Sequence, residues 1–290
     1  MKKIKTKSQF TFIMENLDGK FVRKYKKKET KPYPQTVPEN KMLKLLNYSN
    51  IKSPKILKKH FTSIDIEFIE GREFYNQDKT LLINIVANYI FDLKNINPEP
   101  IKKYIKWNNN TEFFYMHLNK LLDFIKKIKP KNKEKLSMMG IDESILNQFI
   151  NINLYDMRKM TIIHSDIQKD NIINKNTDYF LIDWDQSTYG DIAYEFAIHF
   201  VREKYTPSEM NILLERMCTS LQIEPSSLMN DINIYMQFEN IRATIYYLNK
   251  ACELKNNKQD FTEELDIGYE YYLKLNIGKL KDDIRNIINM

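Results

Sequence analysis

Apolar residues in the second half of the chain recur with the period of an α-helix. From Phe114, the residues at i+4, i+7, i+11 and i+14 are all leucine or isoleucine, and a second apolar stripe of the same spacing starts at Ile234. These stripes predict packed helices. The same reasoning predicts further helices at residues 81–93, 142–155, 194–204, 208–221 and 228–254. Residues 129–135 are highly charged and contain Pro130, so we expect a linker there.

The N-terminal part of the chain alternates between short strand patterns and breaks. We expect strands at residues 10–14 and 20–25, joined by Asn-Leu-Asp-Gly, which has the chemistry of a hairpin turn. A helix is expected at residues 39–46, and two more strands at residues 55–58 and 63–69. The last strand leads into Glu70-Gly71, where we expect a hinge.

Residues 161–163 and 179–182 are short apolar runs, and each ends in a polar cluster, as strands do when they deliver side chains to a site. The polar residues are His164, Asp166 and Asn171, then Asp183 and Asp185. Phosphoryl transfer needs a carboxylate to accept a hydroxyl proton and oxygen ligands for magnesium. Each residue alone would more often be a turn former or helix cap. Their combined spacing predicts a kinase active site.

A phosphate-binding lysine is expected on the second strand, where kinase-like folds keep one. Lys24 shares a strand face with Val22 and is our choice, although a shift of register would favour Arg23 or Lys26. Glu39, at the start of the following helix, is interpreted in two ways with equal weight. It either pairs with this lysine or stabilises the helix N-terminus.

Composition favours a soluble globular enzyme with two lobes and a shared cleft, because the chain has 290 residues, 42% hydrophobic and 29% charged. The longest apolar-rich run, residues 81–91, is too short to span a membrane, and the N-terminus lacks the features of a secretory signal. Cys218 and Cys252 have no metal-ligand spacing. We therefore expect a cytoplasmic protein without a membrane partner.

The net charge of +7 does not by itself indicate a nucleic-acid partner. The densest basic run, residues 23–31, falls on a predicted hairpin and its exit, where a solvated face is the favoured explanation over a polyanion site. We expect no nucleic acid as a partner, although a few lysines near a nucleotide cleft would attract phosphate.

The sequences HSDIQKDNII and LIDWD resemble motifs of the aminoglycoside phosphotransferase and choline kinase family, relatives of protein kinases that phosphorylate small molecules. The likeness extends over most of the chain, including IEFIEG and YGDIAYEFA. It implies an α+β, bilobal, protein-kinase-like fold. Residues 1–71 would form a small, β-rich, nucleotide-binding N-lobe, and residues 72–290 a larger, mostly helical C-lobe with the catalytic loop and the acceptor-binding helices.

The resemblance also implies roles for the central residues. Asp166 corresponds to the catalytic base and His164 to the residue that braces the catalytic loop. Asn171 and Asp183 correspond to magnesium ligands, while Asp185 is either an accessory metal or loop contact or a structural residue. The implied cofactors are Mg²⁺ and ATP or GTP as the phosphate donor.

The nucleotide region departs from the family pattern because no glycine-rich loop precedes the first strand. Residues 6–9 would have to cover the phosphates instead, with Ser8 as our candidate contact. Phe68 and Ile69, at the hinge, are the expected contacts of the nucleobase.

Further departures concern the loop and the helix after it. The family usually has Asp where this chain has Glu195, which we expect to change a structural hydrogen bond rather than the chemistry. Ser165 stands where protein kinases often have arginine, and residues 183–191 are too few for a regulated activation loop. Both features argue against a protein kinase.

The acceptor is expected to be a small, cationic molecule, because the helices after Gly190 mix carboxylates with tyrosines. Carboxylates suit the ammonium groups of an aminoglycoside, and an aromatic cage suits the quaternary ammonium of choline. Helix packing and solvated faces would explain the same residues. Gln168 favours a choline kinase, whereas DWDQ and GDIAYEFA favour an antibiotic kinase, which we place first. A choline or ethanolamine kinase and a non-catalytic nucleotide-binding scaffold remain the alternatives.

Overall fold

The computed structural model of the chain describes residues 2–5, 11–17, 19–25, 37–74, 79–154, 160–221, 225–275 and 281–290. The chain divides into two compact units. Unit 1 consists of residues 1–29, 35–106 and 158–228, and unit 2 of residues 30–34, 107–157 and 229–290. The expected division into lobes at residue 71 stays a prediction.

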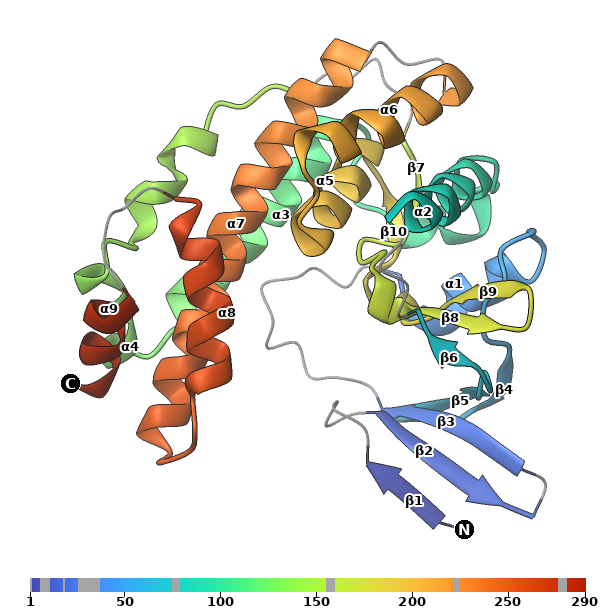
Figure 1. The fold of residues 1–290 in the computed structure, drawn as a ribbon, viewed down its shortest axis with the longest axis horizontal. Coiled ribbons are helices and arrows are strands. Elements are labelled where there is room, and N and C mark those ends of the chain that lie inside the picture. The colour runs from blue at the N-terminus through green and yellow to red at the C-terminus, as the bar shows by residue number, and fades with distance from the viewer. Residues whose placement is uncertain are drawn as a thin grey trace. The chain divides into compact units, whose positions relative to one another are not determined.

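A five-stranded antiparallel sheet with the order β1-β2-β3-β5-β4 forms the N-terminal part of unit 1 (Figure 1). Its strands are β1 Lys2–Lys5, β2 Thr11–Asn16, β3 Gly19–Tyr25, β4 Ile56–Lys59 and β5 Ser63–Glu67. Helix α1, Glu39–Leu46, lies between β3 and β4 in the chain and buries Met42, Leu43, Leu45 and Leu46. The hairpin, this helix and the two following strands confirm the predicted pattern.

A charged cluster on one face of this sheet holds β3 and β5 in register. Arg23 and Asp65 are direct partners across the strands, and Nε and Nη2 of Arg23 donate to the two carboxylate oxygens at 2.6 and 2.7 Å. His60 Nε2 lies 2.9 Å from the same carboxylate. The hydrogen bonds from Arg23 lower the pKa of Asp65. Because side chains alternate along a strand, this pairing directs Lys24 to the opposite face.

The rest of unit 1 contains two small sheets, β10-β7 and β6-β8-β9, and three α-helices in its described part. Its elements are β6 Arg72–Glu73, α2 Lys79–Lys94, η1 Glu99–Tyr104, β7 Thr161–Ile163, η3 Lys169–Asn171, β8 Ile172–Lys175, β9 Asp178–Leu181, η4 Trp184–Gln186, β10 Thr188–Gly190, α5 Ile192–Glu203 and α6 Pro207–Leu221. The strands predicted at residues 161–163 and 179–182 are confirmed as β7 and β9. The short strands β6, β8 and β10 were not predicted.

The regular elements in the described residues of unit 2 are all helices. Its elements are α3 Asn110–Lys127, α4 Pro130–Met138, η2 Glu143–Phe149, most of α7 Pro225–Asn256, α8 Thr262–Leu273 and α9 Lys281–Asn289. The predicted apolar stripe of α3 forms its core, because Phe114 is fully buried and its ring lies 5.5 Å from that of Tyr235 and 5.3 Å from that of Phe238 on α7.

Two predictions in unit 2 were wrong. The expected linker at residues 129–135 is part of helix α4, because Pro130 lies in its first turn, where the missing N–H needs no helical partner. The helix expected at residues 142–155 is a shorter 3₁₀-helix, η2, capped by the Asp142 carboxylate. Tyr155, at its predicted end, lies outside the described residues.

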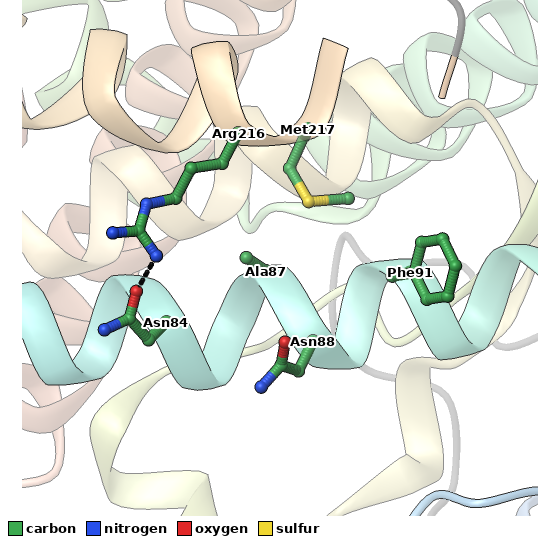
Figure 2. A pocket seen from close by; sticks show the side chains of 6 residues that line it. All are labelled: Asn84, Ala87, Asn88, Phe91, Arg216 and Met217. Atoms are coloured by element: carbon green, nitrogen blue, oxygen red, sulfur yellow. Dashed lines mark hydrogen bonds between the residues drawn. The ribbon is translucent and has the colours of Figure 1, made fainter. Parts of the chain in front are cut away.

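A hollow of about 400 Å³ lies between α2 and α6 in unit 1 (Figure 2). Its lining residues are Asn84, Ala87, Asn88 and Phe91 of α2 and Arg216 and Met217 of α6. A hydrogen bond from Arg216 Nη1 to Asn84 Oδ1 joins the two helices there. The hollow contains none of the predicted site residues.

The expected hinge contains a glycine that a side chain cannot replace. A Cβ added to Gly71 would lie 2.6 Å from both the Asn174 carbonyl oxygen and the Ile173 Cγ2 on β8. Gly71 therefore lets the chain approach β8 closely as it enters β6.

We predict that Gly71→Ala lowers the free energy of unfolding by about 1–3 kcal/mol, because the backbone of β8 must move to admit the methyl group. Urea denaturation of the variant and of Glu70→Ala, at the exposed neighbouring position, measures the difference. An equal effect of the two substitutions would show that β8 does not constrain this position.

Candidate active site

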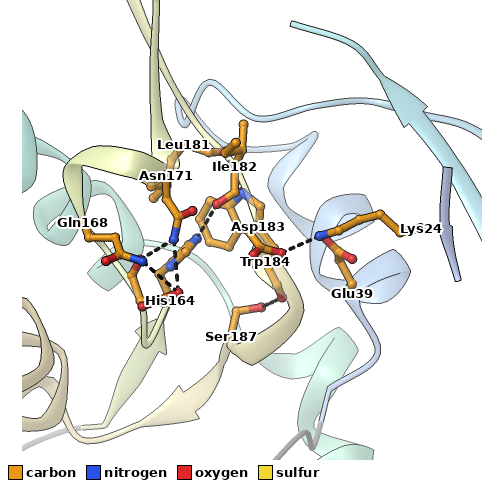
Figure 3. A network of polar contacts seen from close by, with 11 residues as sticks. Lys24, Glu39, His164, Gln168, Asn171, Leu181, Ile182, Asp183, Trp184 and Ser187 are labelled. Carbon is orange, nitrogen blue, oxygen red and sulfur yellow. Dashed lines mark hydrogen bonds and ion pairs between the residues drawn. The ribbon is translucent and has the colours of Figure 1, made fainter. Parts of the chain in front are cut away.

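The predicted catalytic loop follows β7 and folds back on itself around Asp166. Asn171 donates through Nδ2 to both the Asp166 carbonyl oxygen at 2.9 Å and its carboxylate Oδ2 at 3.1 Å. Ser165 has φ 66°, in the left-handed region, so the chain turns sharply just before Asp166. Figure 3 shows Asn171 and Gln168 directed toward this part of the loop. The structure thus brings Asp166 and Asn171 together, as their spacing predicts.

The pKa of the Asp166 carboxyl group is shifted toward neutral pH. Burial raises its pKa to about 7; the positive charge of Arg202 opposes this rise, and the negative charge of Asp183 adds to it. An acid–base group is most effective when its pKa lies close to the working pH. The residue itself is 8% exposed.

His164 connects the catalytic loop to the end of β9. Its Nε2 lies 2.9 Å from the Ile182 carbonyl oxygen, and since a carbonyl only accepts, Nε2 carries the proton. Its ring contacts that of Trp184 edge-on, at 4.5 Å between centroids. Burial lowers the pKa of His164 to about 4, so the ring is neutral at physiological pH. These contacts join the two polar clusters of the sequence.

Asp183 begins a tight turn after β9 and has left-handed backbone angles, φ 62° and ψ 60°. The turn is fixed by Trp184, whose Nε1 donates to the Leu181 carbonyl oxygen at 2.8 Å, and by Ser187, whose Oγ donates to the Trp184 carbonyl oxygen at 2.6 Å. Sequence reasoning missed both residues as part of the site. The signal available in the sequence was a tryptophan among the polar residues of DWDQ, and the structure shows it to be buried.

Lys24 bridges two carboxylates from different parts of the chain (Figure 3). Its Nζ lies 2.5 Å from Asp183 Oδ1 and 2.7 Å from Glu39 Oε1. Burial alone would lower the pKa of Lys24, but the negative charges of Asp183, Glu39 and Asp185 outweigh it and raise the pKa. The structure therefore brings together Lys24, Glu39 and Asp183, in agreement with the choice of Lys24 over Arg23.

The Glu39 side chain makes the ion pair rather than a cap. The residue before α1 is Pro38, and no side-chain hydrogen bond caps the helix. Burial raises the pKa of the Glu39 carboxyl group, and the charge of Lys24 opposes this rise.

The amide oxygen of Asn171 and the carboxylate of Asp183 are donors of the kind that magnesium prefers. Because Asn171 directs Nδ2 toward Asp166, its amide oxygen points away from that residue, and the Asp183 side chain is 38% exposed. Within the described residues there is no cluster of three or more histidine, cysteine, aspartate or glutamate side chains arranged for a metal. Magnesium at phosphoryl-transfer sites needs only one or two protein oxygen ligands besides phosphates and water.

The remaining predicted site residues are Asp185, Phe68, Ile69 and Ser8. Asp185 is half-buried, and its negative charge acts on Lys24, His164 and Asp166. Phe68 and Ile69 follow β5; Ile69 is 4% exposed, and Lys20 Nζ lies 5.9 Å from the centroid of the Phe68 ring. Ser8 lies outside the described residues.

Glu195, in the first turn of α5, supports the catalytic loop. Its Oε2 accepts from the backbone N–H groups of His164 at 2.5 Å and Ser165 at 2.8 Å. These bonds hold the left-handed turn before Asp166. The longer side chain, where the family usually has aspartate, thus makes structural hydrogen bonds to the loop.

Residues 8–221 match the model of the phosphotransferase enzyme family. The chain belongs to this family. The match confirms the expected enzyme class, a phosphotransferase, and the suspected relationship to aminoglycoside and choline kinases. A comparison with curated proteins finds no significant sequence match.

Solved structures of small-molecule kinases share the fold. An ethanolamine kinase of Plasmodium vivax is 17% identical, with a TM-score of 0.62 over 91% of this chain and 78% of its own. The choline kinase LicA of Streptococcus pneumoniae is 14% identical, with a TM-score of 0.60 over 99% and 92%. A spectinomycin phosphotransferase in complex with ADP and spectinomycin is 15% identical, with a TM-score of 0.57 over 99% and 91%. The α+β, protein-kinase-like fold class is confirmed. No described helix is long and apolar enough to cross a membrane.

We predict that Glu195 makes the protein less stable as the pH rises. Burial raises its pKa from 4.5 to about 7, so between these values the folded state keeps a proton that the unfolded state releases. The resulting stabilisation is complete below about pH 4.5 and is lost as the pH approaches 7. Glu195→Gln keeps an oxygen that can accept both N–H groups but does not titrate.

Urea denaturation at pH 5 and pH 7.5 measures this effect. The drop in the free energy of unfolding between the two values should be about 1–3 kcal/mol larger in the parent than in Glu195→Gln. The difference between the two proteins measures the titration of Glu195 together with its electrostatic coupling to Asp166, whose charge also raises the pKa of Glu195. Equal drops would contradict the assignment.

Proposed function

We propose that the protein is a small-molecule kinase that transfers the γ-phosphoryl group of ATP to a hydroxyl group of a small, cationic acceptor. The observation that carries the proposal is the ion-pair network of Lys24, Glu39 and Asp183, which His164 connects to the loop of Asp166 and Asn171 through the Ile182 carbonyl group. It combines a cation for phosphates, oxygen ligands for a metal and a carboxylate with a pKa near 7, which are the parts that phosphoryl transfer requires.

Each residue has one proposed role. Asp166 orients the acceptor hydroxyl and takes its proton as the new oxygen–phosphorus bond forms and the bond to the departing ADP breaks. Lys24, held by Glu39, binds the α- and β-phosphates, and His164 braces the loop. Bound Mg²⁺ would neutralise the charge on the phosphates.

Asn171 and Asp183 are the proposed holders of that magnesium ion, and Asp185 is either an accessory metal contact or a structural one. Phe68 and Ile69 are proposed to contact the nucleobase, and Ser8 a phosphate. ATP is the proposed donor because similar structures hold its hydrolysis products, ADP in the spectinomycin phosphotransferase and AMP in LicA.

We propose an aminoglycoside-like antibiotic as the acceptor. Three of the carboxylates on the helices of unit 2 already have cationic partners within that unit. Glu239 pairs with Arg242 in the core, Glu264 with Lys250 at 2.6 Å, and Asp266 with Lys281 at 2.6 Å. The exposed candidates in this region are Glu253, Asp260, Glu263 and Glu270. Several exposed carboxylates suit a molecule with several ammonium groups.

A choline or ethanolamine kinase is the second candidate, supported by the tyrosines of unit 2. The Tyr247 and Tyr271 rings stack at 6.1 Å with 7° between their planes, and Tyr246 contacts Tyr247 edge-on at 5.1 Å. Aromatic faces attract quaternary ammonium groups.

We also propose a cytoplasmic location, which fits the two free cysteines, Cys218 and Cys252.

We predict that Asp166→Asn lowers kcat by about 10²–10⁴-fold, because it removes the group that accepts the hydroxyl proton. The affinity for magnesium–ATP should stay close to that of the parent, since Asp166 has no proposed role in holding the nucleotide. Coupled ADP release measures turnover and calorimetry measures binding. Activity near that of the parent would refute the role of Asp166.

A panel of acceptors separates the candidates. We expect ADP release that depends on magnesium and is stimulated by aminoglycosides. Stimulation of ADP release by choline or ethanolamine, and not by aminoglycosides, would establish the second candidate. ATP binding without turnover on aminoglycosides, macrolides, choline or ethanolamine would contradict both and favour a nucleotide-binding scaffold.

We predict that Lys24→Met raises the KM for ATP by about ten- to a hundredfold, as expected for loss of a charge-assisted hydrogen bond to a phosphate. Lys58→Met, which removes an exposed lysine from β4, is the matched control and should leave KM unchanged. Equal KM values in the two variants would rule out a phosphate contact by Lys24.

A further inference from the structure

Helix α5 carries three polar side chains, spaced four residues apart, that all contact the catalytic loop. Glu195, His199 and Glu203 occupy positions i, i+4 and i+8 and therefore share one face of the helix. The rest of this helix is mostly apolar and buried. Polar side chains persist in such surroundings only where they have hydrogen-bond partners.

The partners are backbone groups of successive loop residues, in the same order along the chain. Beyond the Glu195 contacts, His199 Nδ1 lies 2.8 Å from the Ile167 carbonyl oxygen, and Glu203 Oε1 accepts from the Lys169 N–H at 2.8 Å. The three side chains span about 12 Å of helix. The loop is thus attached to α5 on both sides of Asp166.

His199 is held in one tautomer by its two neighbours. The Ile167 carbonyl only accepts, so Nδ1 carries the proton and the lone pair of Nε2 faces the Tyr205 hydroxyl, 3.0 Å away. The His199 and Tyr205 rings meet edge-on at 4.9 Å between centroids. His199 is fully buried, and burial lowers its pKa to about 4, so the ring stays neutral.

The turn that ends α5 places Tyr205 for this contact. Lys204 has φ 54°, in the left-handed region, and the next backbone N–H, that of Tyr205, donates to the Phe200 carbonyl oxygen at 3.2 Å. The turn returns Tyr205 to the side of the helix that carries His199. Tyr205, His199 and Ile167 therefore form a continuous hydrogen-bonded chain that leads to the residue next to Asp166.

We propose that α5 is a template for the catalytic loop, in which His199, oriented by Tyr205, and Glu203 are positioning residues for Asp166. This inference rests on the proposed function, because it gives Asp166 the role of catalytic base. Asp166 acts only if its carboxylate lies within hydrogen-bonding distance of the acceptor hydroxyl. A displacement of about 1 Å in such a group costs about a hundredfold in rate.

The variants are chosen to separate loss of the hydrogen bond from loss of packing. His199→Leu fills the space but removes the donor to Ile167, whereas His199→Asn keeps an N–H donor near the position of Nδ1. Tyr205→Phe removes only the hydroxyl that orients the ring. Val201→Ala is the control, because this buried residue lies on the same helix and its substitution weakens packing without removing a bond to the loop.

The first measurement is hydrogen exchange of the peptide that contains residues 164–169, followed by mass spectrometry, which needs no acceptor. In His199→Leu the exchange should rise about tenfold or more, and in Tyr205→Phe less. His199→Asn and Val201→Ala should stay near the parent. Unchanged exchange in His199→Leu, or an equal rise in Val201→Ala, would overturn the proposal whatever the enzyme's substrate.

The second measurement is steady-state turnover, with ATP hydrolysis by water as the reaction if no acceptor is at hand. In His199→Leu, kcat should fall by about 10- to 100-fold while the KM for ATP stays within about threefold, with partial recovery in His199→Asn. If the hydrogen exchange of residues 164–169 rises in His199→Leu but kcat does not fall, the proposal is overturned. Full activity of Asp166→Asn would instead refute the proposed function and leave the attachment of the loop to α5 intact.

Discussion

One buried ammonium group, that of Lys24, connects three segments of unit 1. Its Nζ binds Glu39 of α1 and Asp183 after β9, and its side chain is only 11% exposed. A charge in this environment is tolerated only when it is paired, so each of the three elements must be in place for the others to be stable. Loss of Lys24 would leave the Glu39 carboxylate buried without a cationic partner.

The position of Lys24 depends in turn on an interaction on the other face of the sheet. The bidentate bond between Arg23 and Asp65 fixes how β3 and β5 pair. A slip of one residue would exchange the faces of Lys24 and Arg23. The register between β3 and β5 therefore decides that Lys24, and not Arg23, faces Glu39 and Asp183.

Negative charge accumulates beyond what Lys24 neutralises in the described part of the site. Burial is the main cause of the raised pKa of Asp166, and the negative charges of Asp183 and Asp185 add to it. A divalent cation bound nearby would stabilise the ionised form of this carboxyl group. This balance supports the proposal of a magnesium-dependent kinase.

Much of the site was predictable from the sequence because its parts are local. The β7 and β9 patterns and the spacing of Asp166, Asn171 and Asp183 follow from apolar runs and short intervals. Long-range contacts were harder to predict. The sequence left Glu39 open between a cap and an ion pair, and the choice of Lys24 over Arg23, with which the structure agrees, depended on strand register. The strands β6, β8 and β10 are as short as β7 and β9, but they mix polar residues or glycine into sequences of two to four residues, so no apolar run marks them.

The contacts of α5 show the same limit. The polar residues at intervals of four, Glu195, His199 and Glu203, are visible in the sequence of a mostly apolar helix. Their partners are backbone groups of another segment, which no side-chain pattern reveals. Helix α4 was missed for a different reason, since Pro130 breaks a helix interior but is favoured in a first turn. The expected lobe boundary at residue 71 stays a prediction.

The measurement that tests the central claim most directly is the binding of Mn²⁺ in place of Mg²⁺, followed by the relaxation of water protons. The account predicts that tight Mn²⁺ binding requires ATP, because phosphates complete the ligand set of Asn171 and Asp183. It should be lost in Asp183→Asn and retained in Lys58→Met. Tight binding that persists in Asp183→Asn, or that is absent when ATP is present, would contradict a metal–nucleotide site at the end of β9.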